Sequence, residues 1–209
     1  MRKQTKSTTD KRLEILQALA KLLEEESMER ITTAKLATAL HVSEAALYRH
    51  FSKKSDMFDG LIDFVETSLL DLFAKIRERK DLNALAKIHA MVAVMLDFAT
   101  LNKGICQVLT GHALVSESPA LNERLNTLYG KFETILRQTY KDAIVEKLLP
   151  ADFSATARAN LVFSYVLGRW TTFVLTHYRE KINGVSPLAL APFTPVSYTH
   201  LRAHETKAN

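Results

Sequence analysis

Apolar residues recur along most of the chain with the spacing of amphipathic α-helices. Between residues 13 and 23 they fall every three or four positions, the period of one helix face: Leu13, Leu16, Leu19, Ala20 and Leu23. A longer series of this kind runs from about residue 54 to residue 79, and others cover residues 91–98, 121–136 and 161–174. No segment shows the strict alternation of a strand. The pattern therefore predicts an all-α fold.

Residues 32–58 predict two short helices joined by a tight turn, followed directly by the long helix. Thr32 or Thr33 and Ser43 stand where their side-chain oxygens can cap the two helix starts. The connection between the helices, residues 40–42, has about the three residues that a helix-turn-helix requires. This arrangement is typical of proteins that place the second helix in a groove of DNA.

The polar side of the second short helix has the composition of a surface that contacts DNA. Small Ala45 allows close approach to bases, and cations, hydroxyls and the next helix start suit phosphates. A helical hairpin without a ligand is the alternative, and the clustered cations favour DNA. The predicted DNA-binding residues are Thr32, Thr33, Lys35, Ser43, Glu44, Ala45, Tyr48, Arg49, His50, Lys53 and Lys54.

Composition indicates a soluble globular protein. Of 209 residues, 47% are hydrophobic and 24% charged, and no apolar stretch reaches the length of about 20 residues that spans a bilayer. The single cysteine, Cys106, excludes an internal disulfide framework and fits a reducing cytoplasm. The net charge is +5, and residues 30–54 carry five cations against Glu44 alone, which predicts salt-sensitive DNA binding. The basic opening residues fit either DNA contact or a solvated tail.

Enzyme chemistry has no support in the sequence. The six glycines form no phosphate-binding loop, and the histidines have no cysteine or carboxylate neighbours at ligand spacing. We therefore expect neither catalysis, nor a cofactor, nor a metal.

The last two predicted helices carry more apolar residues than one inward stripe needs, which is typical of an interface. We expect them to pair with a second copy in a two-fold dimer that binds a palindromic site with half-sites about one helical turn apart. The predicted dimer residues are Phe132, Leu136, Tyr165, Val166, Trp170 and Phe173.

The chain divides into three predicted parts. Residues 1–53 form the helix-turn-helix domain, and residues 54–182 form a helical dimerisation and regulatory domain. Residues 183–209 contain three prolines and show no helical period. We expect this last part to be irregular, either disordered or non-native.

Residues 13–62 resemble the N-terminal domain of TetR-family regulators. Three stretches, Ile31–Ala37, Val42–Phe51 and Leu109–Leu114, are similar to the branch of that family that acts in nucleoid occlusion. The resemblance implies a three-helix DNA-binding domain joined by a long fourth helix to a dimerisation domain. It also implies a cytoplasmic, nucleoid-associated dimer that inhibits assembly of the division protein FtsZ when bound to palindromic chromosomal sites.

The resemblance further implies a surface for FtsZ on the fourth and fifth helices. It would contain Phe64, Ser68, Val94, Asp97 and Asn102, together with Leu101. The branch carries arginines on this surface, where the present chain has Leu72 and Leu101.

The alternative is a transcriptional repressor released from its operator by a small molecule, the commonest role in the wider family. It requires an apolar cavity in the larger domain, with lining residues such as Met91, Met95, Phe98, His112, Tyr165 and Trp170. Their pattern favours a core over a pocket. A purely structural helical protein, the third possibility, would lack salt-sensitive affinity for DNA.

Overall fold

The computed structural model describes residues 8–25 and 31–182, and the described residues contain helices but no strand, as the apolar spacing predicts. The predicted irregular segment 183–209 and most of the basic opening segment lie outside the described residues. The helices are α1 (Thr8–Glu25), α2 (Thr33–Ala39), α3 (Glu44–Tyr48), α4 (Lys54–Glu78), α5 (Ala84–Leu101), α6 (Lys103–Leu109), the 3₁₀ helix η1 (His112–Leu114), α7 (Pro119–Val145) and α8 (Ala155–Leu175).

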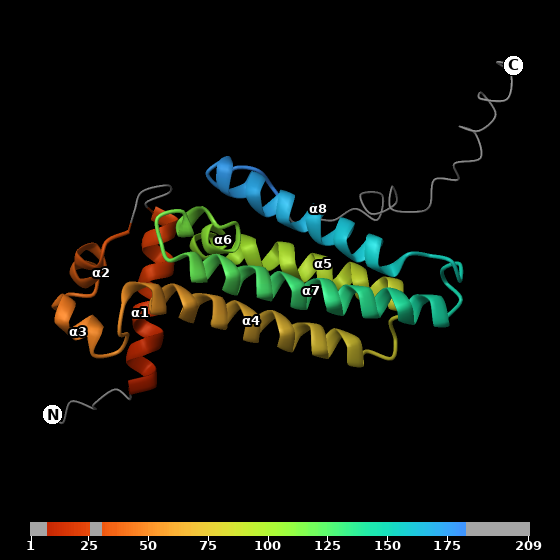
Figure 1. Cartoon of the computed structure of the whole chain (residues 1–209), viewed down its shortest axis with the longest axis horizontal. Coiled ribbons are helices and arrows are strands. Elements are labelled where there is room, and N and C mark those ends of the chain that lie inside the picture. The colour runs from red at the N-terminus through yellow and green to blue at the C-terminus, as the bar shows by residue number, and fades with distance from the viewer. Residues whose placement is uncertain (1–7, 26–30, 183–209) are drawn as a thin grey trace, which may run out of the picture.

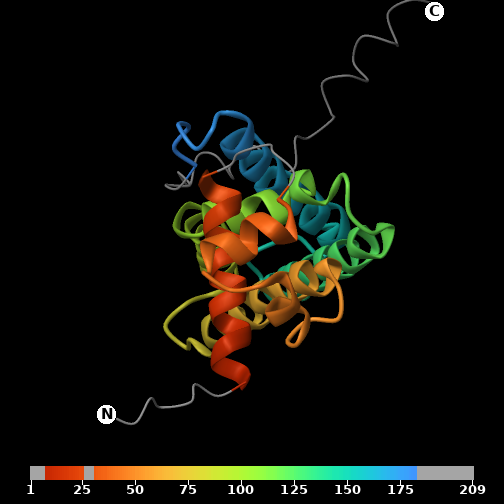
Figure 2. The same cartoon turned by 90° about the vertical axis from the view of Figure 1, so that its left-hand side faces the viewer.

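A small head at one end of the molecule is joined to a longer helical body (Figure 1). Helices α1, α2 and α3 form the head, and α4 runs from the head along the body beside α5 and α7. With 25 residues, α4 is about 37 Å long, which is why it serves both parts. Helix α1 crosses the ends of the body helices, as Figure 2 shows from the head end.

The core of the head corrects the predicted apolar stripe of α1. Ile15, Leu19 and Leu23 are buried, whereas Leu13 is 47% exposed. Their spacing of four residues places them on one face, and that face packs with Leu36 and Leu47 of α2 and α3 in one continuous core. The predicted stripe was therefore wrong at Leu13 and omitted Ile15. Helix α1 packs against α2, α4 and α6.

Helix α5 lies at the centre of the body and packs against α4, α6, α7 and α8. It is also the one helix of the described chain that is long and apolar enough to cross a membrane. Met91, Val92 and Met95 on this helix have no exposed surface, and the indole Nε1 of Trp170 donates to the carbonyl of Met95 at 3.0 Å. Its central position therefore accounts for its apolar composition.

The lone cysteine is part of the same core. Cys106 is fully buried, and burial raises the pKa of its thiol to about 12. Because the thiolate is the reactive form, this cysteine serves packing.

Helix α6 packs so closely on α1 that backbone meets backbone. A Cβ atom placed at Gly104 would lie 1.8 Å from the carbonyl oxygen of Ala20, nearer than atoms can approach. Three residues further on, the buried side chain of Gln107 donates to the carbonyl of Leu23 and to the hydroxyl of Tyr178. This packing fixes the head against the body.

We predict that Gly104→Ala and Gly130→Ala shift stability in opposite directions. At Gly104 the methyl group collides with backbone, which should lower the free energy of unfolding by about 3 kcal/mol or more. At Gly130, an exposed position in α7 with nothing within 4 Å of an added Cβ, alanine should raise it by roughly 0.5–1 kcal/mol. Urea unfolding followed by circular dichroism measures both. Equal stability of the two variants would contradict the close packing of α6 on α1.

Candidate DNA-binding site and interaction surfaces

The two short helices of the head begin at the predicted caps. The hydroxyl of Thr32 accepts from the backbone N–H of Lys35 at 3.2 Å, and that of Ser43 accepts from Ala46 at 3.2 Å. Each bond satisfies one of the free N–H groups at a helix start. Thr32 and Ser43 therefore cap α2 and α3, as the sequence predicts.

The turn between α2 and α3 is closed by its own backbone. The N–H of His41 donates to Thr38 and that of Val42 to Ala37, both at 3.0 Å. These two bonds form a Schellman motif, in which the residue after the C-cap adopts the left-handed conformation. That residue is His41, with φ of 54°. The motif sets the angle at which α3 leaves α2.

Most of the predicted DNA-binding residues are exposed. The exposed ones are Thr32, Lys35, Ser43, Glu44, Ala45, Tyr48, Arg49 and Lys53. The other three, Thr33, His50 and Lys54, are half-buried, and each is engaged within the head or with the body. The hydroxyl of Thr33 donates to the carboxylate of Glu44 and so links α2 to α3.

His50 differs from the prediction, because it lies between α1 and α3. Its ring lines a small cavity with Lys11, Ile15 and Leu47, and its buried Nδ1 has no hydrogen-bond partner in the described structure. The carbonyl of His50 accepts from the guanidinium of Arg12. Its position makes His50 a part of the packing of the head.

Sequence reasoning missed the role of Arg12, which it placed in the basic opening segment. The guanidinium bonds to His50 and lies 4.1 Å from the centre of the Phe51 ring, a cation–π distance. It thereby fixes the end of the α3 region to α1. The contact joins residues 38 positions apart, so no local pattern could have indicated it.

The side chain of Lys54 also contacts other residues of the chain. Its ammonium forms an ion pair with Glu117, in the loop between η1 and α7, and lies 5.4 Å from the centre of the Phe58 ring. Lys53 remains exposed at the start of α4, where its Nζ is 3.9 Å from Asp56.

The predicted partner residues lie on adjacent helices. Phe64, Ser68 and Leu72 follow one face of α4 at intervals of four residues, and Val94, Asp97 and Leu101 follow one face of α5. The rings of Phe64 and Phe98 lie 6.3 Å apart, which joins the two faces. Phe64 is 41% exposed and Leu101 is 82% exposed. We call these six residues the α4–α5 surface.

Asn102 is less accessible to a partner protein than the prediction implies. It stands between α5 and α6, is half-buried, and its Nδ2 donates to the carbonyl of Phe98 at 2.8 Å.

The predicted dimer residues are corrected by the structure. Five of them lie inside the single chain with at most 4% of their surface exposed: Phe132, Leu136, Val166, Trp170 and Phe173. Helix α7 packs against α4, α5 and α8, and α8 packs against α5, α6 and α7. These neighbours within one chain cover the apolar residues that the sequence assigns to a dimer. Of the six, Tyr165 alone is half-exposed.

Another face of α8 remains uncovered by the described chain. Leu161, Tyr165, Gly168, Thr172 and Leu175 follow one another at intervals of four and three residues, so they share a face. Leu161 and Leu175 are 46% and 53% exposed, and a Cβ placed at Gly168 would meet nothing within 4 Å. We call these five residues the α8 stripe.

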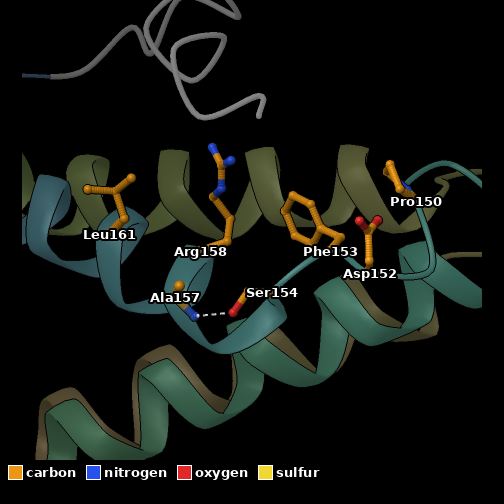
Figure 3. A pocket seen from close by; sticks show the side chains of 7 residues that line it. All are labelled: Pro150, Asp152, Phe153, Ser154, Ala157, Arg158 and Leu161. Carbon is orange, nitrogen blue, oxygen red and sulfur yellow. Dashed lines mark hydrogen bonds between the residues drawn. The ribbon is translucent and has the colours of Figure 1, made fainter. Parts of the chain in front are cut away.

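A shallow pocket adjoins the end of the α8 stripe that is remote from the head. Figure 3 shows Leu161 of the stripe beside Arg158 and Phe153, and the capping bond from Ala157 to Ser154 below them. The guanidinium of Arg158 lies 5.2 Å from the centre of the Phe153 ring. The pocket thus extends the uncovered face of α8.

The residues considered for a ligand cavity belong mainly to the core. Met91, Met95 and Trp170 have no exposed surface, and Phe98 is 8% exposed. The described pockets are lined by other residues. Within the described residues, no three histidine, cysteine or carboxylate side chains are grouped to hold a metal.

A three-helix head with a helix-turn-helix, joined by one long helix to a helical body, defines a regulator of the TetR class. Residues 15–61 match the family described as bacterial regulatory proteins of the tetR family, and residues 82–185 match the SlmA-like family, described as a tetracyclin repressor-like C-terminal domain.

Curated relatives narrow the assignment. The chain is 41% identical to the nucleoid occlusion factor SlmA of Idiomarina loihiensis over 82% of its own length and 87% of the relative. It is 38% identical to SlmA of Shewanella amazonensis over 84% and 89%. The chain belongs to the SlmA family of nucleoid occlusion factors.

Solved structures of low identity share the fold. The fatty acid degradation regulator FadR from Bacillus halodurans superposes with a TM-score of 0.69 at 14% identity, covering 85% of this chain and 92% of that one. A TetR transcriptional regulator from Legionella pneumophila gives 0.66 at 16% identity, covering 83% and 90%.

We predict that the turn between α2 and α3 tolerates asparagine but not valine at position 41. A β-branched side chain is strained in the left-handed conformation, so His41→Val should lower the free energy of unfolding by about 1–2 kcal/mol. Asparagine adopts this conformation readily, and His41→Asn should leave stability nearly unchanged. Thermal or urea unfolding compares the two. A valine variant as stable as the asparagine variant would show that the turn does not need this backbone shape.

Proposed function

We propose that this protein is a dimeric nucleoid occlusion factor: it binds palindromic chromosomal sites and, while bound, inhibits assembly of FtsZ. The observation that carries the proposal is the presence, in one SlmA-family chain, of a helix-turn-helix head and an exposed α4–α5 surface on the long helix that leaves that head. The corresponding location is the cytoplasm, on the nucleoid.

The DNA contact is assigned to the exposed polar face around α3. Ala45 lies in the first turn of α3 and is exposed, so its methyl group is placed to meet base edges, including a thymine methyl. Tyr48, Arg49 and Lys53 flank it and are assigned to the phosphate backbone, which positions the protein without reading sequence.

Substitutions at these two kinds of position should act differently. Ala45→Gly should reduce the preference for a palindromic over a scrambled duplex by about 1 kcal/mol, because a base contact is lost. Arg49→Gln should weaken binding to both duplexes alike and reduce the salt slope by about one, because a phosphate contact is lost. Fluorescence anisotropy titrations at several salt concentrations measure both effects. Equal losses on both duplexes for Ala45→Gly would refute its role in reading bases.

The dimer contact is assigned to the α8 stripe. Exposed Leu161 and Leu175 supply apolar area, and Gly168 at the middle allows the backbones of two helices to approach closely. A two-fold axis there would bring the same stripe of the second copy into contact, and so present two heads to the two halves of a palindrome.

Filling the centre of the α8 stripe should separate the dimer without unfolding the chain. Gly168→Leu adds bulk where nothing lies within 4 Å in the single chain, and leucine favours the helix more than glycine does. Gly130→Leu, at an equally open position on α7, is the matched control. Sedimentation equilibrium should give a monomer for the first variant and a dimer for the second. A dimeric Gly168→Leu protein would rule the stripe out.

FtsZ is assigned to the α4–α5 surface. Phe64 and Leu101 expose apolar area beside the carboxylate of Asp97. Because α4 begins in the head, DNA that favours one position of α4 also favours one state of this surface. A ligand shifts a conformational equilibrium only through such a difference in affinity.

Leu101→Ser should abolish the effect on FtsZ and leave DNA affinity unchanged, because this side chain is exposed at the end of α5 and is not among the residues assigned to DNA. Val145→Ser, which removes a comparably exposed apolar side chain from the end of α7, is the control. The measurement is sedimentation of FtsZ polymers formed with GTP in the presence of each variant and a palindromic duplex. If both variants behave as the unaltered protein does, FtsZ binds elsewhere.

A further inference from the structure

Lys54, the first residue of α4 and a predicted DNA-binding residue, forms an ion pair with the body of the molecule. The ammonium of Lys54 donates to the carboxylate of Glu117, 63 residues further along the chain. Only 19% of the Lys54 side chain and 9% of the Glu117 side chain are exposed. Solvent and salt therefore screen this pair less than they screen an ordinary surface pair.

Lys54 is also the cation at the start of a long helix, where backbone N–H groups favour an anion. Carboxylate and phosphate oxygens are both anionic acceptors, and each competes for the same compact ammonium charge. In the structure, Glu117 holds that charge.

We propose that Glu117 competes with the DNA backbone for Lys54, so that DNA binding exchanges a carboxylate for a phosphate. The exchange limits the affinity for DNA of any sequence, and it frees the loop between η1 and α7 from the start of α4. This inference rests on the proposed function and adds to it a phosphate contact of Lys54, one of the DNA-binding residues predicted from the sequence.

The rest of the α4–α7 contact would survive the exchange. Arg124, in the second turn of α7, donates to Asp63 at 2.7 Å and to Glu66 at 2.6 Å. These two carboxylates lie about two and a half and three turns beyond the first residue of α4. Lys131 also bonds to Glu66, and this bond, with those from Arg124, holds the pKa of the Glu66 carboxyl below its usual value. Neither Arg124 nor Lys131 is assigned to DNA. Loss of the Lys54–Glu117 pair would therefore change the contact only at the head end of α4.

The test is Glu117→Gln, which keeps the shape of the side chain and an acceptor oxygen but removes the charge. At low salt we expect it to bind palindromic and scrambled duplexes about three- to ten-fold more tightly. The slope of log K against log salt should steepen by up to about one, because Lys54 then displaces counterions without first losing an internal partner. Glu123→Gln, at an exposed position one turn into α7, is the control for the change in net charge.

A second set of measurements uses Lys54→Gln, alone and combined with Glu117→Gln. Alone, it should weaken binding to both duplexes, and in its presence Glu117→Gln should have no effect. If Lys54→Gln leaves affinity unchanged, the proposed phosphate contact fails. If Lys54→Gln weakens binding but Glu117→Gln matches Glu123→Gln, the contact stands and the competition is refuted. A gain from Glu117→Gln that persists without Lys54 also refutes the competition. Circular dichroism verifies that each variant is folded.

Discussion

The contact of α6 with α1 is the constraint on which the arrangement of the molecule depends. Gly104 brings the backbones of the two helices together, and Gln107 uses its buried amide to bond the carbonyl of Leu23 near the end of α1. Lys103 adds an ion pair to Glu24 at 3.1 Å. Because α1 carries the core of the head and α6 leaves the central helix α5, this contact determines where the helix-turn-helix lies relative to the body.

Some cations of the head are engaged by carboxylates of the same chain. Lys11 pairs with Glu14 at 2.9 Å, and Lys54 pairs with Glu117. The exposed Lys11–Glu14 pair contributes little to stability. The less exposed Lys54–Glu117 pair is the one that we propose to compete with phosphates. The DNA affinity of such a head depends on the balance between internal and external anions, so a count of cations in the sequence overestimates it.

Local features of this fold were predictable from the sequence, and long-range ones were not. The caps at Thr32 and Ser43 and the start of α7 at Pro119 follow from residues within one helical turn. The predicted dimer residues Phe132 and Trp170 proved to be core, because periodicity gives the apolar face of a helix but not what covers it. Glu117 and Arg12 act across 63 and 38 residues, and a single sequence has no signal for such pairs.

The central claim is that DNA occupancy turns this protein into an inhibitor of FtsZ assembly. The most direct measurement is sedimentation of FtsZ polymers formed with GTP in the presence of the unaltered protein and either a palindromic duplex bound by SlmA relatives or a scrambled duplex of the same composition. Anisotropy in the same buffer verifies that the palindrome is occupied. The account predicts loss or altered bundling of polymers with the palindrome alone. Unchanged polymers with a fully occupied palindrome would contradict it.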